Sequence, residues 1–66
     1  MRRYLIHHGD GETWDLVVID KVWLVERVGL LSKQKQSFSL AEFEKSSMGL
    51  ALWDQLNDAM ARALKE

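Results

Sequence analysis

The residues that could carry chemistry gather near the N-terminus, in the stretch HHGDGE at residues 7–12. His7 and His8 offer imidazole nitrogens, and Asp10 and Glu12 offer carboxylates. Such groups are the donors of zinc sites and of general acid–base catalysis. Successive side chains of a strand point to opposite faces, so the two histidines would not converge on one ion. The pattern therefore favours the polar end of a strand that runs into a turn over a metal site or a catalytic site. A metal-dependent site at residues 7–12 is the third of the functional hypotheses.

No other motif in the chain is typical of an enzyme. The sequence has no G-x-S-x-G motif, and GDGE lacks the lysine and the length of a phosphate-binding loop. Small-molecule pockets have volumes of roughly 300 Å³ or more. A chain of 66 residues has little interior to spare for one. We expect a protein that is not an enzyme and has no cofactor.

Two strand-like segments flank the first two glycines. Residues 2–8 (RRYLIHH) contain a short apolar run, and residues 13–19 (TWDLVVI) are rich in β-branched residues. Trp14, Leu16 and Val18 alternate with their neighbours and would share one face of a strand. Asp-Gly and Gly-Asp pairs between the segments are typical of two-residue hairpin turns, which need positive φ. The region predicts a β-hairpin.

Residues 20–31 (DKVWLVERVGLL) fit a helix slightly better than a strand. Asp20 could cap the first turn, and Gly29 could end the last one. The apolar residues with the spacing of one helix face are Leu24, Val25, Val28 and Leu31. We predict a helix, with a third strand as the competing interpretation because residues 22–25 favour strands. The polar segment SKQKQS at residues 32–37 is expected to be a connection.

The last third of the chain predicts helices. Ser39 and Glu42 have the spacing of a capping box, which would begin a short helix carrying Leu40 and Phe43. The SSMG stretch at residues 46–49 is expected to kink or break it. Residues 50–66 then predict a long amphipathic helix. Its apolar stripe is Leu52, Trp53, Leu56, Ala59, Met60, Ala63 and Leu64.

Together these elements predict one small α+β domain over residues 1–66. An N-terminal β-hairpin would pack on two or three helices, and the last would be the long amphipathic C-terminal helix. Hydrophobic residues make up 47% of the chain, with three tryptophans and no cysteine. A core this small is marginal without disulfides, a metal or a partner chain. We therefore expect a homodimer.

The chain has no segment that suits a membrane. The longest apolar run is LVVI at residues 16–19, far shorter than the ~20 residues that span a bilayer. The apolar run after the two N-terminal arginines is too short for a signal peptide. We expect a soluble, cytoplasmic protein, and the lack of cysteine fits a reducing compartment.

Residues 39–60 could instead form a helix-turn-helix that binds DNA, because a short helix and a glycine turn precede a longer helix. The charges argue against it. The net charge of the chain is −1, and Asp54 and Asp58 would meet phosphates on the second helix. Binding to nucleic acid usually needs a basic surface. A DNA-binding regulator is therefore the second hypothesis.

The leading hypothesis is a surface that binds another protein. Tryptophan and arginine are enriched at the energetic centres of interfaces. Trp23 and Leu30 flank Arg27 on a second face of residues 20–31. The residues expected to contact a partner are Trp23, Arg27, Leu30, Trp53, Asp54 and Asp58. The apolar ones would anchor the partner, and the charged ones would set its orientation.

The words YLIHHGD, ETWDL, VWLVER and FSLAEFEKS, in this order, span most of the chain. In these words the chain resembles small early proteins of transposable bacteriophages. Those host-takeover proteins bind and disable a bacterial quorum-sensing regulator or the ATPase that assembles type IV pili. The resemblance implies a non-enzymatic, dimeric inhibitor that acts on a host protein inside an infected bacterium. It carries no motif with defined chemistry, so no functional residue is transferred.

Overall fold

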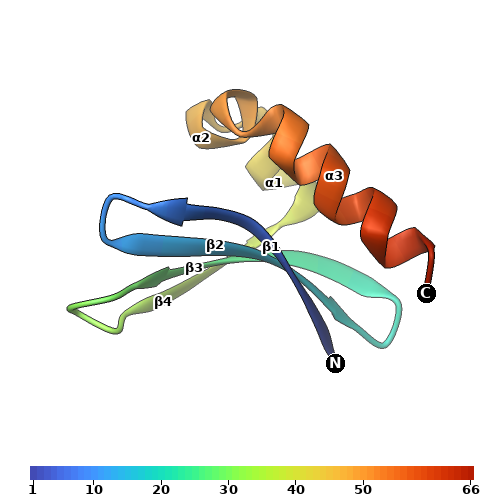
Figure 1. Cartoon of the computed structure of the whole chain (residues 1–66), viewed down its shortest axis with the longest axis horizontal. Helices are drawn as coiled ribbons and strands as arrows, with labels where there is room; N and C mark the ends of the chain where they lie inside the picture. Colours follow the sequence, from blue (N-terminus) through green and yellow to red (C-terminus); the bar gives the residue numbers. More distant parts are fainter.

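The computed structural model describes residues 1–66 and has the predicted α+β class. A four-stranded antiparallel sheet is followed by three helices (Figure 1). The strands, in the same order along the sheet, are β1 (Arg2–Gly9), β2 (Glu12–Ile19), β3 (Val22–Gly29) and β4 (Lys35–Ser39). The helices are α1 (Leu40–Lys45), α2 (Ser47–Ala51) and α3 (Trp53–Leu64). No helix is both long and apolar enough to cross a membrane.

The predicted N-terminal hairpin is confirmed. β1 and β2 are joined by Asp10 and Gly11, whose φ angles of 52° and 74° are those of a two-residue turn with two left-handed positions. The pairing shifts by one residue between Leu5 and His7, so Ile6 is the extra residue of a β-bulge. The bulge keeps Ile6 buried although the alternation is interrupted.

The helix predicted over residues 20–31 is wrong, and the competing strand interpretation is correct. β3 pairs with β2 along its whole length, from Val22 opposite Ile19 to Gly29 opposite Glu12. Asp20 is not a helix cap: with Lys21 it forms the tight turn, at φ angles of 48° and 70°. Pairing with both neighbouring strands outweighed a stripe that also fits a helix, because β-branched residues suit a pleated sheet.

The connection predicted at residues 32–37 is only half correct. Its first half is a turn, but Lys35 begins β4, which pairs with β3 as far as Ser39. The polar composition of this segment is explained by its place at the edge of the sheet. Edge strands are often short and carry polar side chains.

The predicted capping box is confirmed, since Ser39 and Glu42 each accept a backbone hydrogen bond from the other, at 3.1 and 3.0 Å. The predicted break follows at Ser46, which ends α1 and caps α2. Gly49 is required there, because a β-carbon would lie 1.7 Å from the carbonyl oxygen of Phe43. The C-terminal helix is shorter than predicted: α3 has 12 residues, because the chain breaks again at Leu52.

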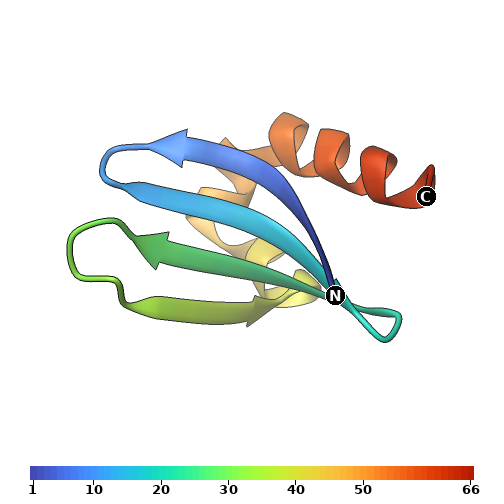
Figure 2. The ribbon, with the colours of Figure 1, turned by 60° about the horizontal axis from the view of Figure 1, so that its bottom comes forward.

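The helices all lie on one face of the sheet, here called the inner face (Figure 2). Alternate residues of the strands point into the core between the two layers. The buried core consists of Tyr4, Ile6, Trp14, Leu16, Val18, Val25, Phe43, Leu52, Leu56, Ala59 and Ala63. The opposite face, here called the open face, has no helix over it. The strand side chains that point to the open face are therefore not covered by the chain's own helices.

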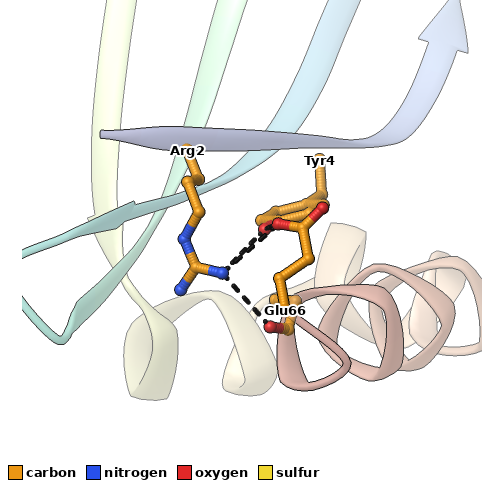
Figure 3. Close-up of polar contacts among 4 residues, drawn as sticks. Arg2, Tyr4 and Glu66 are labelled. Atoms are coloured by element: carbon orange, nitrogen blue, oxygen red, sulfur yellow. Dashed lines mark hydrogen bonds and ion pairs between the residues drawn. The ribbon is translucent and has the colours of Figure 1, made fainter.

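The end of α3 is tied to the start of β1 (Figure 3). The hydroxyl of Tyr4 donates a hydrogen bond to the carboxylate of Glu66. The guanidinium of Arg2 lies 3.0 Å from the Tyr4 oxygen and 3.3 Å from the Glu66 carboxylate. The hydrogen bond to Glu66 is the main cause that raises the pKa of Tyr4, and the same bond lowers the pKa of Glu66. These contacts hold α3 along β1.

Candidate functional site

The predicted contact residues of β3 point to the inner face. Trp23 is half-buried and packs against the core. Arg27 lies at the other end of the strand, with its guanidinium carbon 5.5 Å from the ring centroid of Trp14. Leu30 lies beyond β3 in the turn to β4 and is half exposed. The structure thus places Trp23 and Arg27 on one face, separated by the buried Val25, and Leu30 outside the sheet.

The predicted contact residues of α3 are exposed. Trp53 begins the helix and keeps 43% of its surface exposed, although it was expected in the core stripe. Leu64, expected in the same stripe, is 74% exposed. Only one side of the expected stripe is buried, because the core needs no more than the residues that face the sheet. Asp54 and Asp58 are exposed on the neighbouring side of the helix.

The exposed apolar residues of α3 form a line along the helix. Trp53, Met60 and Leu64 are separated by seven and four residues, which places them on one side of a helix with 3.6 residues per turn. We call this line the α3 flank. Met60 is partly buried against the core, and the other two residues are exposed. The flank is an apolar strip beside an acidic one, which suits contact with a protein.

The open face carries a network of four charged side chains that was not predicted. Arg3 reaches from β1 across β2 and donates to Glu26 on β3 at 2.5 Å. It also lies 4.0 Å from Asp15. On the other side, the ammonium of Lys35 lies 3.1 Å from Glu26. Two cations and two carboxylates balance on a surface that no helix covers.

The network explains why two residues of the open face are buried. Val17 is fully buried, and Glu26 is 4% exposed. The path of Arg3 from β1 to β3 crosses β2, so its aliphatic stem covers Val17, its partner in the register. A buried carboxylate is costly unless it is paired with opposite charges and hydrogen-bonded, and Glu26 has both partners.

The carboxyl groups of Glu26 and Asp15 respond differently to this environment. Burial would raise the pKa of Glu26, but the hydrogen bonds and charges of Arg3 and Lys35 outweigh it and hold that pKa below its usual value. Burial raises the pKa of Asp15, and the charge of Arg3 only partly opposes the shift. The two groups are register partners, yet their pKa values shift in opposite directions: folding favours the ionised form of Glu26 and the protonated form of Asp15.

A polar cleft of about 330 Å³ lies at the turn end of the sheet. Its lining residues are Asp10, Gly11, Glu12, Arg27, Gly29, Ser32, Gln34 and Gln36. The guanidinium of Arg27 donates two hydrogen bonds, of 2.6 and 3.0 Å, to the carboxylate of Glu12. These hydrogen bonds are the main cause that lowers the pKa of Glu12. The buried indole N–H of Trp14 is near Glu12 but makes no hydrogen bond of normal geometry.

The neighbouring histidines His7 and His8 have different partners on β2. His7 is opposite Trp14, and His8 is opposite Thr13, with 2.9 Å between its Nδ1 and the threonine hydroxyl. No three or more histidine and carboxylate side chains are grouped so that they could hold a metal ion. Asp10 and Glu12 line the cleft, which sequence reasoning missed because Gln34 and Gln36 were expected in a connection.

A sequence signal for the open face was present. Arg3, Asp15 and Glu26 each stand next to residues of the buried face within a strand-like segment, which is typical of a face turned away from the core. The signal could be used only after residues 20–31 were recognised as a strand.

Comparison with protein families, with curated proteins and with solved structures found no match of any of the three kinds.

Proposed function

We propose that the protein is a non-enzymatic inhibitor or adaptor that binds another protein. The observation that carries the proposal is the α3 flank, where Trp53 is 43% exposed in a chain with very little core. An exposed tryptophan in line with Leu64 is costly in water and is typical of a contact surface. Asp54 and Asp58 beside the flank would orient a partner by charge rather than add much affinity.

The mechanism would be occlusion of the partner, one molecule on one molecule. By the resemblance of the sequence, the protein is encoded by a phage and blocks a protein in the cytoplasm of the bacterial host. The proposed targets are a quorum-sensing transcription regulator and the type IV pilus ATPase. In this proposal Trp53 enters an apolar recess of the target, and Trp23, Arg27 and Leu30 contribute at most a secondary contact.

A binding assay with both purified targets tests the proposal. Trp53→Ala is expected to weaken binding at least tenfold, the loss of a typical anchor of ~2 kcal/mol. Gln55→Ala is the matched control, because Gln55 is also exposed on α3 but lies off the flank. The proposal fails if the native protein binds neither target, or if Trp53→Ala binds as well as the control with its fold intact.

We also propose that the open face joins two copies of the chain. Leu5, Ile19 and Val22 are 49%, 37% and 54% exposed on this face. Its charges sum to zero, so two copies would not repel each other. The molecule measures 32 × 24 × 18 Å, and its broad side has the extent of a standard interface of ~800 Å² per partner. Sedimentation of the native chain and of Val22→Glu tests this: a dimer should become a monomer.

The second hypothesis, a DNA-binding regulator, has less support. Asp54 and Asp58 are exposed on the helix that would read the bases, and carboxylates there repel phosphates. A mobility-shift assay at low salt distinguishes the two hypotheses. Binding to duplex DNA that weakens steeply as salt rises would favour the regulator.

A further inference from the structure

The free edge of β4 offers unpaired backbone groups. In an antiparallel ladder, alternate residues bond to the neighbouring strand and the residues between them point outward. Gly29 donates to the carbonyl of Gln34 at 3.1 Å, which assigns Gln36 to the residues that bond to β3. The N–H and C=O groups of Lys35 and Ser37 therefore point away from the sheet. Four backbone groups stand in a row on this edge.

The other edge of the sheet, on β1, is obstructed. The bulge between Leu5 and His7 interrupts its row of backbone groups. The guanidinium of Arg62 donates to the outward carbonyl of Leu5 at 2.6 Å, so α3 occupies this edge. On β4, one outward backbone group already has a partner within the chain: the N–H of the last residue, Ser39, donates to the Glu42 side chain. The two edges therefore differ: one is blocked, and one can accept a strand.

The polar cleft continues from the β4 edge. Gln34 and Gln36, from the turn and from β4 itself, line one side of the cleft. Its three charged side chains are Asp10, Glu12 and Arg27, which sum to −1. Arg27 donates to Glu12 and, at 3.3 Å, to the amide oxygen of Gln36. The carboxylate of Asp10 and the amide oxygen of Gln34 are left to accept hydrogen bonds. A cleft of this composition suits a guanidinium or ammonium group.

We propose that the β4 edge receives an extended segment of the partner protein, and that a basic side chain of this segment enters the polar cleft. The inference rests on the proposed function and names how the partner is engaged. Backbone hydrogen bonds to Lys35 and Ser37 give the segment its strand conformation. The cleft gives it a preference for arginine or lysine.

A second copy of the chain fits this edge less well. Two copies of β4 related by a two-fold axis must run antiparallel, so the residues after Ser39 of one copy would lie at the cleft of the other. Those residues form α1, which has no extended backbone to offer and carries Glu42 in its first turn. A carboxylate would then face a cleft whose own charge is negative.

Titration with model peptides, followed by NMR of the backbone amides, tests the proposal. The probe is a five-residue peptide of alternating threonine and valine with arginine at its centre, blocked at both ends. The comparison probes carry glutamate in place of arginine, or a methyl group on every backbone nitrogen. We expect shifts and slowed hydrogen exchange at Lys35 and Ser37, and binding at least tenfold tighter for the arginine probe than for the glutamate probe. The N-methylated probe should not bind.

Ser37→Pro is the matching variant. It removes an outward N–H but none of the hydrogen bonds to β3, and proline is tolerated at sheet edges. It should abolish binding of the arginine probe. If this variant does not fold, the N-methylated probe makes the same test on the native chain.

Three results would overturn the proposal. Protection at Arg3 or His8 would place the added strand on β1. Protection of Lys35 and Ser37 that rises with protein concentration, without probe, would assign the edge to a second copy. Equal binding of the arginine and glutamate probes would remove the role of the cleft. If the arginine probe binds as expected but neither proposed target does, the edge site stands and the proposed function fails.

Discussion

The two faces of the sheet are built from the same strands but differ in composition and in what covers them. The inner face is apolar where α1 and α3 cover it, with Phe43 and Leu56 fully buried between the layers. The open face holds a balanced set of charges over the buried Val17, with exposed apolar residues around it. The difference shows that alternation along a strand separates a surface that is buried in the core from one that no helix covers. Four predictions test this separation.

The largest effect is expected on the inner face. Phe43→Ala removes a fully buried ring that packs at a tilt of 39° against Trp14, with 5.3 Å between the ring centroids. The loss of transfer energy and the cavity should lower the free energy of unfolding by about 3–5 kcal/mol. Denaturation by urea measures it. Phe43→Leu should lower the free energy of unfolding by less than half as much. It replaces the alanine variant in the measurement if that variant is too unstable.

A medium effect is expected in the charge network of the open face. Arg3→Met leaves Glu26 with Lys35 alone, so a buried carboxylate loses its closest partner. We expect a loss of about 1–2 kcal/mol, less than for a fully buried pair because water reaches Arg3. The double variant Arg3→Met with Glu26→Met should recover most of the loss. If the double variant is less stable than Arg3→Met alone, the loss in Arg3→Met does not come from leaving the carboxylate of Glu26 buried without its closest partner.

The pH dependence of stability should reveal the two carboxyl groups separately. Because the pKa of Glu26 is lowered by folding, its contribution is present above its unfolded pKa and is lost as pH falls through the folded pKa. The raised pKa of Asp15 has the opposite sign: its ionisation destabilises the fold at neutral pH, and protonation removes that cost.

Unfolding curves between neutral pH and the acid range check these signs. Glu26→Gln should make stability less sensitive to acid, and Asp15→Asn should make it more sensitive. Both variants changing the slope in the same direction would contradict the assigned shifts. The double variant Asp15→Asn with Glu26→Gln should have an acid sensitivity of stability between those of the two single variants.

The smallest effect on stability is expected at the apolar residues of the open face. Val22 is 54% exposed, and Val22→Thr keeps its β-branched shape. Its free energy of unfolding should change by less than about 0.5 kcal/mol. Self-association measured by sedimentation should weaken nevertheless. A large loss of stability without a change in association would mean that this part of the open face belongs to the core.

Much of the local structure could be predicted from short patterns. The turn at Asp10 and Gly11, the capping box at Ser39 and the break near Gly49 each depend on residues close together in the sequence. Residues 20–31 could not be assigned in this way, because their apolar spacing fits a helix stripe as well as two alternating strand faces. Only the pairing of β3 with both β2 and β4 decides between them.

The candidate surfaces follow the same division. The exposure of Asp54 and Asp58 could be predicted from the helix period. The exposure of Trp53 could not, because the predicted apolar stripe has seven residues and the helix period does not say which of them face the sheet. The network around Glu26 joins four strands, and no spacing along the chain indicates it.

By itself, the sequence determined the α+β class, the turn chemistry and the absence of cysteine. These are properties of residue type and of neighbours within a few positions. Only the tertiary structure decided which apolar residues stay exposed, which edge of the sheet is blocked by Arg62 and which carboxylate is buried. Burial and blocked hydrogen bonds depend on segments distant in the sequence, and their placement is a property of the whole fold.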